Sequence, residues 1–260
     1  MEKQELISYQ IQQRIIYITL NRPEKRNALN QQMVEELTAA FTKAKTDKHG
    51  KVIVLKAVGK TFCAGADLAY IQSLQNFSYE ENLADSNQLK ALFELIYTHP
   101  KVVIAQVEGH ALAGGCGLAT VCDFVFSVPN AKFGYTEVKI GFIPAIVMVF
   151  LIRKIGESRA KRLLLSGEIY TAEEILSTGL FHKLCPPDSI ANEVAEFATS
   201  LCENNSETAM AITKSMIAEL QSMSIEQAFS FAAEKNAKAR STADCKKGIS
   251  AFLNKEKPTW

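Results

Sequence analysis

The stretch ALAGGCGLAT, residues 111–120, places Gly114, Gly115 and Gly117 within four positions, between one apolar segment and another. Glycine inside regular secondary structure is destabilising by roughly 0.5–1 kcal/mol relative to alanine, so three together indicate a backbone that bends or is closely approached. The approaching partner is a packed helix, a phosphate or a reacting atom. Which of these applies depends on the rest of the chain.

Apolar segments rich in β-branched residues lie on both sides of this stretch. They predict strands at residues 6–20 (a strand or hairpin), 51–57, 101–109 and 123–128. Helical spacing follows the turn at Pro23 as far as about Lys45 and returns at 87–97, and the glycine-rich stretch itself opens a helix to Val121. We expect a mobile polar loop at 76–85 and only helices from about Ser200. Strands that alternate with helices predict an α/β fold.

Composition limits the classes of partner. The 260 residues carry a net charge of +1, with 47% hydrophobic and 22% charged residues, so nothing indicates nucleic-acid or membrane binding. The longest apolar run, residues 142–152, contains Pro144 and is too short to span a bilayer. The six cysteines include no C-x-x-C pair, which is typical of reduced, mostly buried thiols and predicts a cytoplasmic protein.

Several familiar site motifs are absent from the sequence. The segment VGKT, 58–61, looks like the end of a phosphate-binding loop, but that motif requires glycine at position 54, where Val54 stands. There is no G-x-S-x-G motif of a serine hydrolase. The four histidines lack metal-ligand spacing, so we predict no bound metal.

Two loops share one predicted geometry. CAGAD (63–67) and LAGGCG (112–117) each follow a buried strand, contain small residues and open a helix. The first N–H groups of a helix are unpaired and carry partial positive charge, so two such ends side by side can hold one oxyanion. The same small residues would equally allow helices to pack close to the sheet. Spacing alone leaves both interpretations open.

Several blocks of sequence resemble the crotonase family, the enoyl-CoA hydratases and isomerases. They stand in the family's order and spacing over nearly the whole chain: NRPEKRNALN (21–30), GKTFCAGADL (59–68), VEGHALAGGCGLATVCDFVF (107–126), AKFGYTEVKIGFIPA (131–145), GESRAKRLLLSGEIYTAEEILSTGLF (156–181) and GISAFLNK (248–255). The resemblance implies a catalytic spiral of β-β-α turns over residues 1–200 and a helical segment over 201–260 that builds trimers, often paired into hexamers. The expected partners are an acyl-CoA thioester and further copies of the chain, with no cofactor besides the coenzyme A of the substrate.

The resemblance also implies a catalytic site. By motif position, the N–H groups of Ala66 and Gly114 hold the thioester oxygen as it becomes an enolate, and Glu137 transfers a proton at the substrate's α-carbon. Burial raises the pKa of a carboxyl group, which suits proton transfer near neutral pH. The best-known hydratases of the family carry a second glutamate where this chain has Gly117, and we expect this glycine to make room for a branched acyl group.

Residues 134–168 are similar to the branch of methylglutaconyl-CoA hydratases. The resemblance therefore implies an enoyl-CoA hydratase, a carbon–oxygen lyase, acting on a branched substrate such as 3-methylglutaconyl-CoA. Two alternatives stay open. One is a Δ3,Δ2-enoyl-CoA isomerase or related CoA-ester lyase, for which one carboxylate is sufficient. The other is a non-catalytic member that binds acyl-CoA or RNA, and the intact Glu137 and both loops count against it.

Eight further residues match family positions that contact coenzyme A. Basic residues lie near its phosphates, others line the pantetheine and adenine route, and the last pair reaches the adenine end from a neighbouring subunit. In that order they are Lys25, Arg26 and Lys60; Ala28, Ala64 and Asp67; and Phe252 and Lys255.

Overall fold

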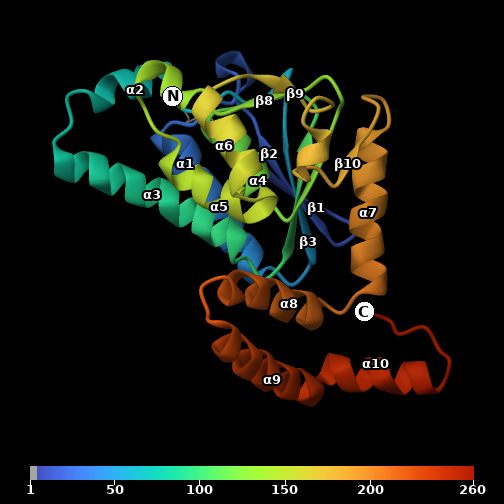
Figure 1. The fold of residues 1–260 in the computed structure, drawn as a ribbon. Helices are drawn as coiled ribbons and strands as arrows, with labels where there is room; N and C mark the ends of the chain where they lie inside the picture. Colours follow the sequence, from blue (N-terminus) through green and yellow to red (C-terminus); the bar gives the residue numbers. More distant parts are fainter. Residues whose placement is uncertain (1–4) are drawn as a thin grey trace.

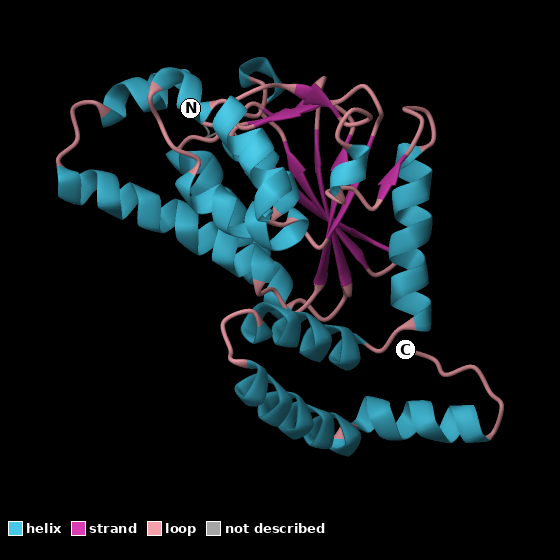
Figure 2. Ribbon diagram, in the orientation of Figure 1, coloured by secondary structure: helices cyan, strands magenta, loops and turns pink. Residues whose placement is uncertain are grey.

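The computed structural model describes residues 5–260, in which helices surround two β-sheets (Figures 1 and 2). The larger sheet has six strands in the order β1-β2-β3-β5-β7-β10. The first two form an antiparallel hairpin, as expected within residues 6–20, and the later strands join in parallel. The strands are β1 (Ile7–Gln12), β2 (Ile15–Leu20), β3 (Val52–Ala57), β5 (Val102–Val107), β7 (Phe124–Ser127) and β10 (Lys183–Leu184).

The smaller sheet has four strands in the order β4-β6-β8-β9, which are β4 (Thr61–Cys63), β6 (His110–Leu112), β8 (Lys132–Gly134) and β9 (Tyr170–Thr171). The chain passes from the larger sheet to the smaller one in each turn, from β3 to β4, from β5 to β6 and from β7 to β8, and helices follow each time. This repeated β-β-α turn is the spiral that the resemblance implied. Strand β4 is not among the strands that the sequence predicted.

Helices cover the sheets on more than one side. Their bounds are η1 (Pro23–Lys25), α1 (Gln31–Thr46), α2 (Leu68–Leu74), α3 (Tyr79–Tyr97), α4 (Gly114–Thr120), η2 (Glu137–Ile140), α5 (Ala145–Ile155), α6 (Glu157–Ser166), η3 (Leu176–Thr178), α7 (Ile190–Asn204), α8 (Glu207–Leu220), α9 (Ile225–Ser241) and α10 (Ala243–Leu253). Helix α7 packs across the larger sheet, and α4 and α5 pack on each other (Figure 1). Every residue of β5 is buried, which explains why its sequence is almost continuously apolar.

Residues 76–85 do not form the expected mobile loop, because α3 begins within them at Tyr79. Ser78 caps this helix by accepting a hydrogen bond from the Glu81 N–H, and the Glu81 side chain accepts one from the Ser78 N–H. The buried residues of α3 are Leu92, Phe93 and Ile96, all in its second half. Apolar periodicity therefore indicated only that half, whereas the exposed first half is marked by its capping box.

The C-terminal helices α8, α9 and α10 lie beyond one end of the larger sheet (Figure 1). This confirms that the chain is helical from about Ser200 onward. Neither α8 nor α9 contains a buried residue, and Ile225, Phe229 and Phe252 are 77%, 73% and 82% exposed. Within residues 5–260, no helix combines the length and the apolar character needed to cross a membrane.

Candidate active site

The two loops singled out in the sequence touch each other in the fold. Gly65 follows β4, and Ala113 and Gly114 follow β6, its neighbour in the smaller sheet. A Cβ atom on Gly65 would lie 2.8 Å from the Ala113 Cβ and 3.4 Å from the Gly114 nitrogen. Gly65 also has a φ of +87°, which glycine adopts without strain. The contact between the loops thus depends on glycine at position 65.

The backbone N–H of Ala66 points away from the neighbouring segment. Leu29 forms an isolated parallel bridge with Ala66, in which the Leu29 N–H donates to the Gly65 carbonyl (2.7 Å) and the Asp67 N–H donates to the Leu29 carbonyl (2.8 Å). In a parallel bridge of this kind the central residue points its own N–H away from the partner strand. Ala66 is exposed, and its N–H has no acceptor among residues 5–260.

The Gly114 N–H is the second unpaired donor. Gly114 is the first residue of α4, so its N–H has no acceptor within that helix. No other acceptor lies within reach in the described part of the chain. Two backbone donors on two touching loops are therefore left without an acceptor in the described part of the chain.

The three glycines of α4 have different reasons to be there. A Cβ on Gly115 would lie 2.2 Å from the Cys63 carbonyl oxygen, and one on Gly117 would lie 2.1 Å from Cγ1 of Val147 in α5. Both glycines are therefore required by close packing. A Cβ on Gly114 would meet nothing closer than a carbon of Leu29 at 3.6 Å, an ordinary contact. The expectation that Gly117 makes room for a branched acyl group is wrong, because Val147 fills that space.

Glu137 begins η2, after β8. Its Oε2 atom is shielded from solvent and has no hydrogen-bond partner among residues 5–260. Burial raises the pKa of this carboxyl above its ordinary value, because desolvation disfavours the charged form. Tyr135, two residues before Glu137, is fully buried, and its hydroxyl lies 2.9 Å from the Thr120 hydroxyl in α4. This hydrogen bond fixes the segment that carries Glu137 against α4.

Six of the predicted coenzyme A contacts lie on two paired segments. The Ala64 N–H donates to the Arg26 carbonyl (3.1 Å), and a Cβ on Gly59 would lie 2.9 Å from the Pro23 Cβ. The pairing places the segment 25–28 beside the segment 60–67. In these segments Lys25, Arg26 and Lys60 are exposed, Ala64 is half-buried, and Ala28 and Asp67 are buried.

The other two predicted contacts, Phe252 and Lys255, do not join this group. Phe252 belongs to α10 and Lys255 follows it, and both are exposed. Helix α10 lies at the end of the molecule opposite to β8 and β9 (Figure 1).

Arg22 and Asn27 were not predicted as site residues, although both support the Ala66 loop. The Asn27 side chain is fully buried and donates to the carbonyls of Val58 (2.9 Å) and Thr61 (2.8 Å). In the sequence, Arg22 and Asn27 could have been found only through the polar segment NRPEKRN, which directly follows the core strand β2.

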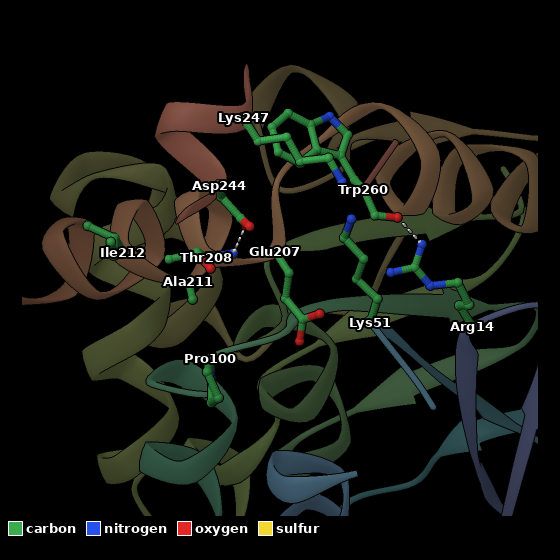
Figure 3. A pocket seen from close by; sticks show the side chains of 10 residues that line it. All are labelled: Arg14, Lys51, Pro100, Glu207, Thr208, Ala211, Ile212, Asp244, Lys247 and Trp260. Carbon is green, nitrogen blue, oxygen red and sulfur yellow. Dashed lines mark hydrogen bonds between the residues drawn. The ribbon is translucent and has the colours of Figure 1, made fainter. Parts of the chain in front are cut away.

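A cavity of about 470 Å³ lies elsewhere, between the core and the C-terminal helices (Figure 3). Its charged groups join parts of the chain to each other. The Lys51 ammonium donates to the Cys202 carbonyl (2.8 Å) at the end of α7, Asp244 accepts from Thr208, and Arg14 binds the Trp260 carbonyl. No predicted catalytic residue lines this cavity. Over residues 5–260, no three potential metal ligands of the His, Cys, Asp or Glu type lie together.

Comparison with known proteins shows the family of the chain. The sequence profile of the enoyl-CoA hydratase/isomerase family matches residues 10–260. A Thermus thermophilus protein provisionally assigned as an enoyl-CoA hydratase is 41% identical over 244 residues, 94% of this chain and 96% of that protein. The crotonyl-CoA hydratase of Syntrophomonas wolfei is 33% identical over 97% of this chain and 96% of its own. The crystal structure of an enoyl-CoA hydratase from Shewanella pealeana superposes with a TM-score of 0.93 at 29% identity, covering 98% of this chain and 96% of that one.

The paired sheets, the touching loops and the whole-length matches together define an acyl-CoA enzyme fold of the crotonase type. The chain belongs to the enoyl-CoA hydratase/isomerase family.

Proposed function

We propose that this chain is an enoyl-CoA hydratase, which adds water across the 2,3 double bond of an enoyl-CoA thioester. The observation that carries the proposal is the pair of unpaired N–H groups, of Ala66 and Gly114, on loops that touch. When water attacks the β-carbon, negative charge moves to the thioester oxygen. Two preorganised backbone donors stabilise that charge, and loss of one such donor typically raises a barrier by about 2.7–4 kcal/mol.

Glu137 supplies the proton chemistry in this proposal. As a carboxylate it accepts a proton from the attacking water, whose oxygen bonds to the β-carbon. It then gives that proton to the α-carbon, so the enolate collapses to the hydroxyacyl product and the carboxylate is restored. Burial raises the pKa of this carboxyl, which makes its carboxylate a stronger base than an exposed one toward the attacking water, and this supports the role.

The proposed substrate is a branched enoyl-CoA such as 3-methylglutaconyl-CoA, on the resemblance of residues 134–168. Its coenzyme A moiety would pass along the paired segments 25–28 and 60–67, where the exposed Lys25, Arg26 and Lys60 offer positive charge to phosphates. The proposed reaction uses no cofactor besides the coenzyme A of the substrate.

We also propose a cytoplasmic location. The cysteines described are free thiols, which supports it.

A double-bond isomerase is the alternative, and one observation favours it. Val147 occupies the space beside Gly117, so no second carboxylate of the best-known hydratases stands there to hold the water. An isomerase moves one proton between carbons and needs only Glu137.

Oxygen labelling separates these two reactions. We expect that turnover of enoyl-CoA thioesters in ¹⁸O water places the label at the β-hydroxyl of the product, because the attacking oxygen comes from solvent. Mass spectrometry of products from a panel of linear and branched acyl-CoAs measures this. Rapid conversion of 3-enoyl to 2-enoyl thioesters with no label in any product would replace the hydratase by the isomerase.

Assembly is a separate part of the proposal. We propose that residues 201–260 build a homotrimer or hexamer, since apolar side chains such as Ile225 and Phe229 on α9 stay exposed in the single chain. Light scattering should give a mass that is three or six times 28.7 kDa. Phe252→Ala should raise KM for the acyl-CoA if α10 completes a neighbour's site. A stable monomer with full activity would contradict this part.

A further inference from the structure

An ion pair lies directly behind the Ala66 loop. Nη1 of Arg22 is 2.7 Å from Oδ2 of Asp67, and the two side chains are only 14% and 11% exposed. The other carboxylate oxygen, Oδ1, accepts hydrogen bonds from the N–H groups of Ala69 (2.9 Å) and Tyr70 (3.4 Å) and so caps helix α2. Both oxygens of Asp67 are therefore engaged inside the chain.

Arg22 is itself held in place by the core. Its backbone N–H donates to the side chain of the buried Asn27 (2.8 Å), and its guanidinium also donates to the Ala28 carbonyl (3.3 Å). Asn27 in turn anchors the carbonyls of Val58 and Thr61, at the two ends of the turn that leads into β4. A continuous set of hydrogen bonds thus connects β3 and β4 to the Asp67 carboxylate.

The Ala66 N–H shares a peptide plane with the Gly65 carbonyl, and Asp67 follows Ala66 directly, so contacts on both sides of Ala66 orient this donor. The bridge to Leu29 fixes the Gly65 carbonyl on one side of Ala66 and the Asp67 N–H on the other. Helix α2, which starts at the next residue, contains no buried residue and so gives little support of its own. The side-chain contacts of Asp67 add to this bridge, because they link the first turn of α2 and the end of the Ala66 loop to Arg22.

We infer that Arg22 and Asp67 are positioning residues, whose ion pair holds the Ala66 N–H at the angle at which it meets the thioester oxygen. The inference rests on the proposed function, since it gives that N–H its role. It gives Asp67 a role besides the predicted contact with the pantetheine and adenine part of coenzyme A, because both carboxylate oxygens are engaged within the chain.

The carboxylate of Asp67 remains charged over the working pH range. Burial alone would raise its pKa, but the hydrogen bonds from Arg22 and from the Ala69 and Tyr70 N–H groups lower it below the ordinary value. Asp67→Asn is therefore the most informative variant. Asparagine keeps the size of the side chain and is a good helix cap, so the change removes the charge and spares the cap.

The experiment measures the thioester carbonyl directly. Butyryl-CoA labelled with ¹³C at the carbonyl is saturated and cannot be hydrated, and its carbonyl stretch in the infrared falls when the oxygen accepts strong hydrogen bonds. We expect a lower frequency on binding to the wild-type protein and a smaller shift with Asp67→Asn. We also expect kcat on an enoyl-CoA substrate to fall by roughly 10- to 100-fold, with KM and the Kd of butyryl-CoA unchanged.

Two further variants keep the test decisive. Arg22→Lys keeps the positive charge but loses the forked donor, and it should give an intermediate carbonyl shift even if Asp67→Asn folds poorly. Asp123→Asn is the matched control, because Asp123 forms an ion pair with Lys214 at the same 2.7 Å, outside both loops. It should lower stability and leave the carbonyl frequency unchanged.

The outcomes test the oxyanion site and the positioning role of Arg22 and Asp67 separately. No carbonyl shift in the wild-type protein would overturn the oxyanion site, and with it the inference. A normal wild-type shift that Asp67→Asn and Arg22→Lys leave intact would overturn the inference alone. A weaker Kd for coenzyme A with an unchanged carbonyl frequency would leave Asp67 as a coenzyme A contact only.

Discussion

Glu137→Gln is expected to lower kcat by about 100-fold or more while leaving the fold and acyl-CoA binding intact. Glutamine has the size and shape of glutamate but cannot accept the proton of the attacking water or deliver one to the α-carbon. The Ala66 and Gly114 donors are untouched, so substrate should still bind through its thioester oxygen. Steady-state kinetics on the best substrate, with the Kd of butyryl-CoA from calorimetry, measure both effects. Turnover near the wild-type rate would reject Glu137 as the acid and base.

The same variant has a predictable effect on stability, which serves as its folding control. The pKa of Glu137 is raised in the folded protein by burial, so folding favours the protonated form. The wild-type protein is thus relatively more stable below the pKa that the group has when unfolded, and this advantage is lost as pH rises through the folded pKa. Glutamine does not titrate. Glu137→Gln should therefore be at least as stable as wild type at neutral pH, and its relative stability should decrease on acidification, as urea unfolding at several pH values would measure.

Much of the fold was predictable because its strands are short, apolar and bounded by turns. The strands at 51–57, 101–109 and 123–128 all formed within a residue or two of the expected positions. Where prediction failed, the reason was local. The first half of α3 has almost no buried face, so its only signal is the capping box of Ser78 and Glu81.

The candidate site was less accessible to sequence reasoning. The sequence predicted that the glycine-rich stretch matters, but it could not show why each glycine is needed. Gly115 is required by the Cys63 carbonyl and Gly117 by Val147, contacts between residues far apart in the chain. Likewise, Arg22 and Asp67 are 45 positions apart, and only the fold shows that they pair. Sequence patterns report which residues face the core, whereas these contacts depend on how two turns of the spiral meet.

Gly117→Ala is expected to destabilise the protein, although helix propensity alone predicts the opposite. Alanine inside a helix is favoured over glycine by roughly 0.5–1 kcal/mol. Against that, the new Cβ would lie 2.1 Å from Cγ1 of Val147 and 2.6 Å from its Cβ, so α4 and α5 must move apart. Overpacking of this kind typically costs about 1–3 kcal/mol, and the clash involves the rigid base of a β-branched side chain, so the packing effect should win. The midpoint of urea unfolding measures the result.

Two further variants show whether Val147 is the cause. Gly114→Ala is the matched control in the same helix, because its Cβ would meet only Leu29 at 3.6 Å, and its stability should equal or exceed that of wild type. The double variant Gly117→Ala, Val147→Ala should lose less free energy of unfolding than the two single variants lose together. The added methyl group and the removed side chain compensate for each other.

Gly117→Glu, which would add the second carboxylate of the best-known hydratases, should be more destabilising than Gly117→Ala, because the longer side chain starts from the same clash. If Gly117→Ala is as stable as wild type, α4 and α5 are not packed as described, and a second carboxylate at this position becomes feasible. If it is destabilised, the close packing of Val147 is the reason for glycine at position 117.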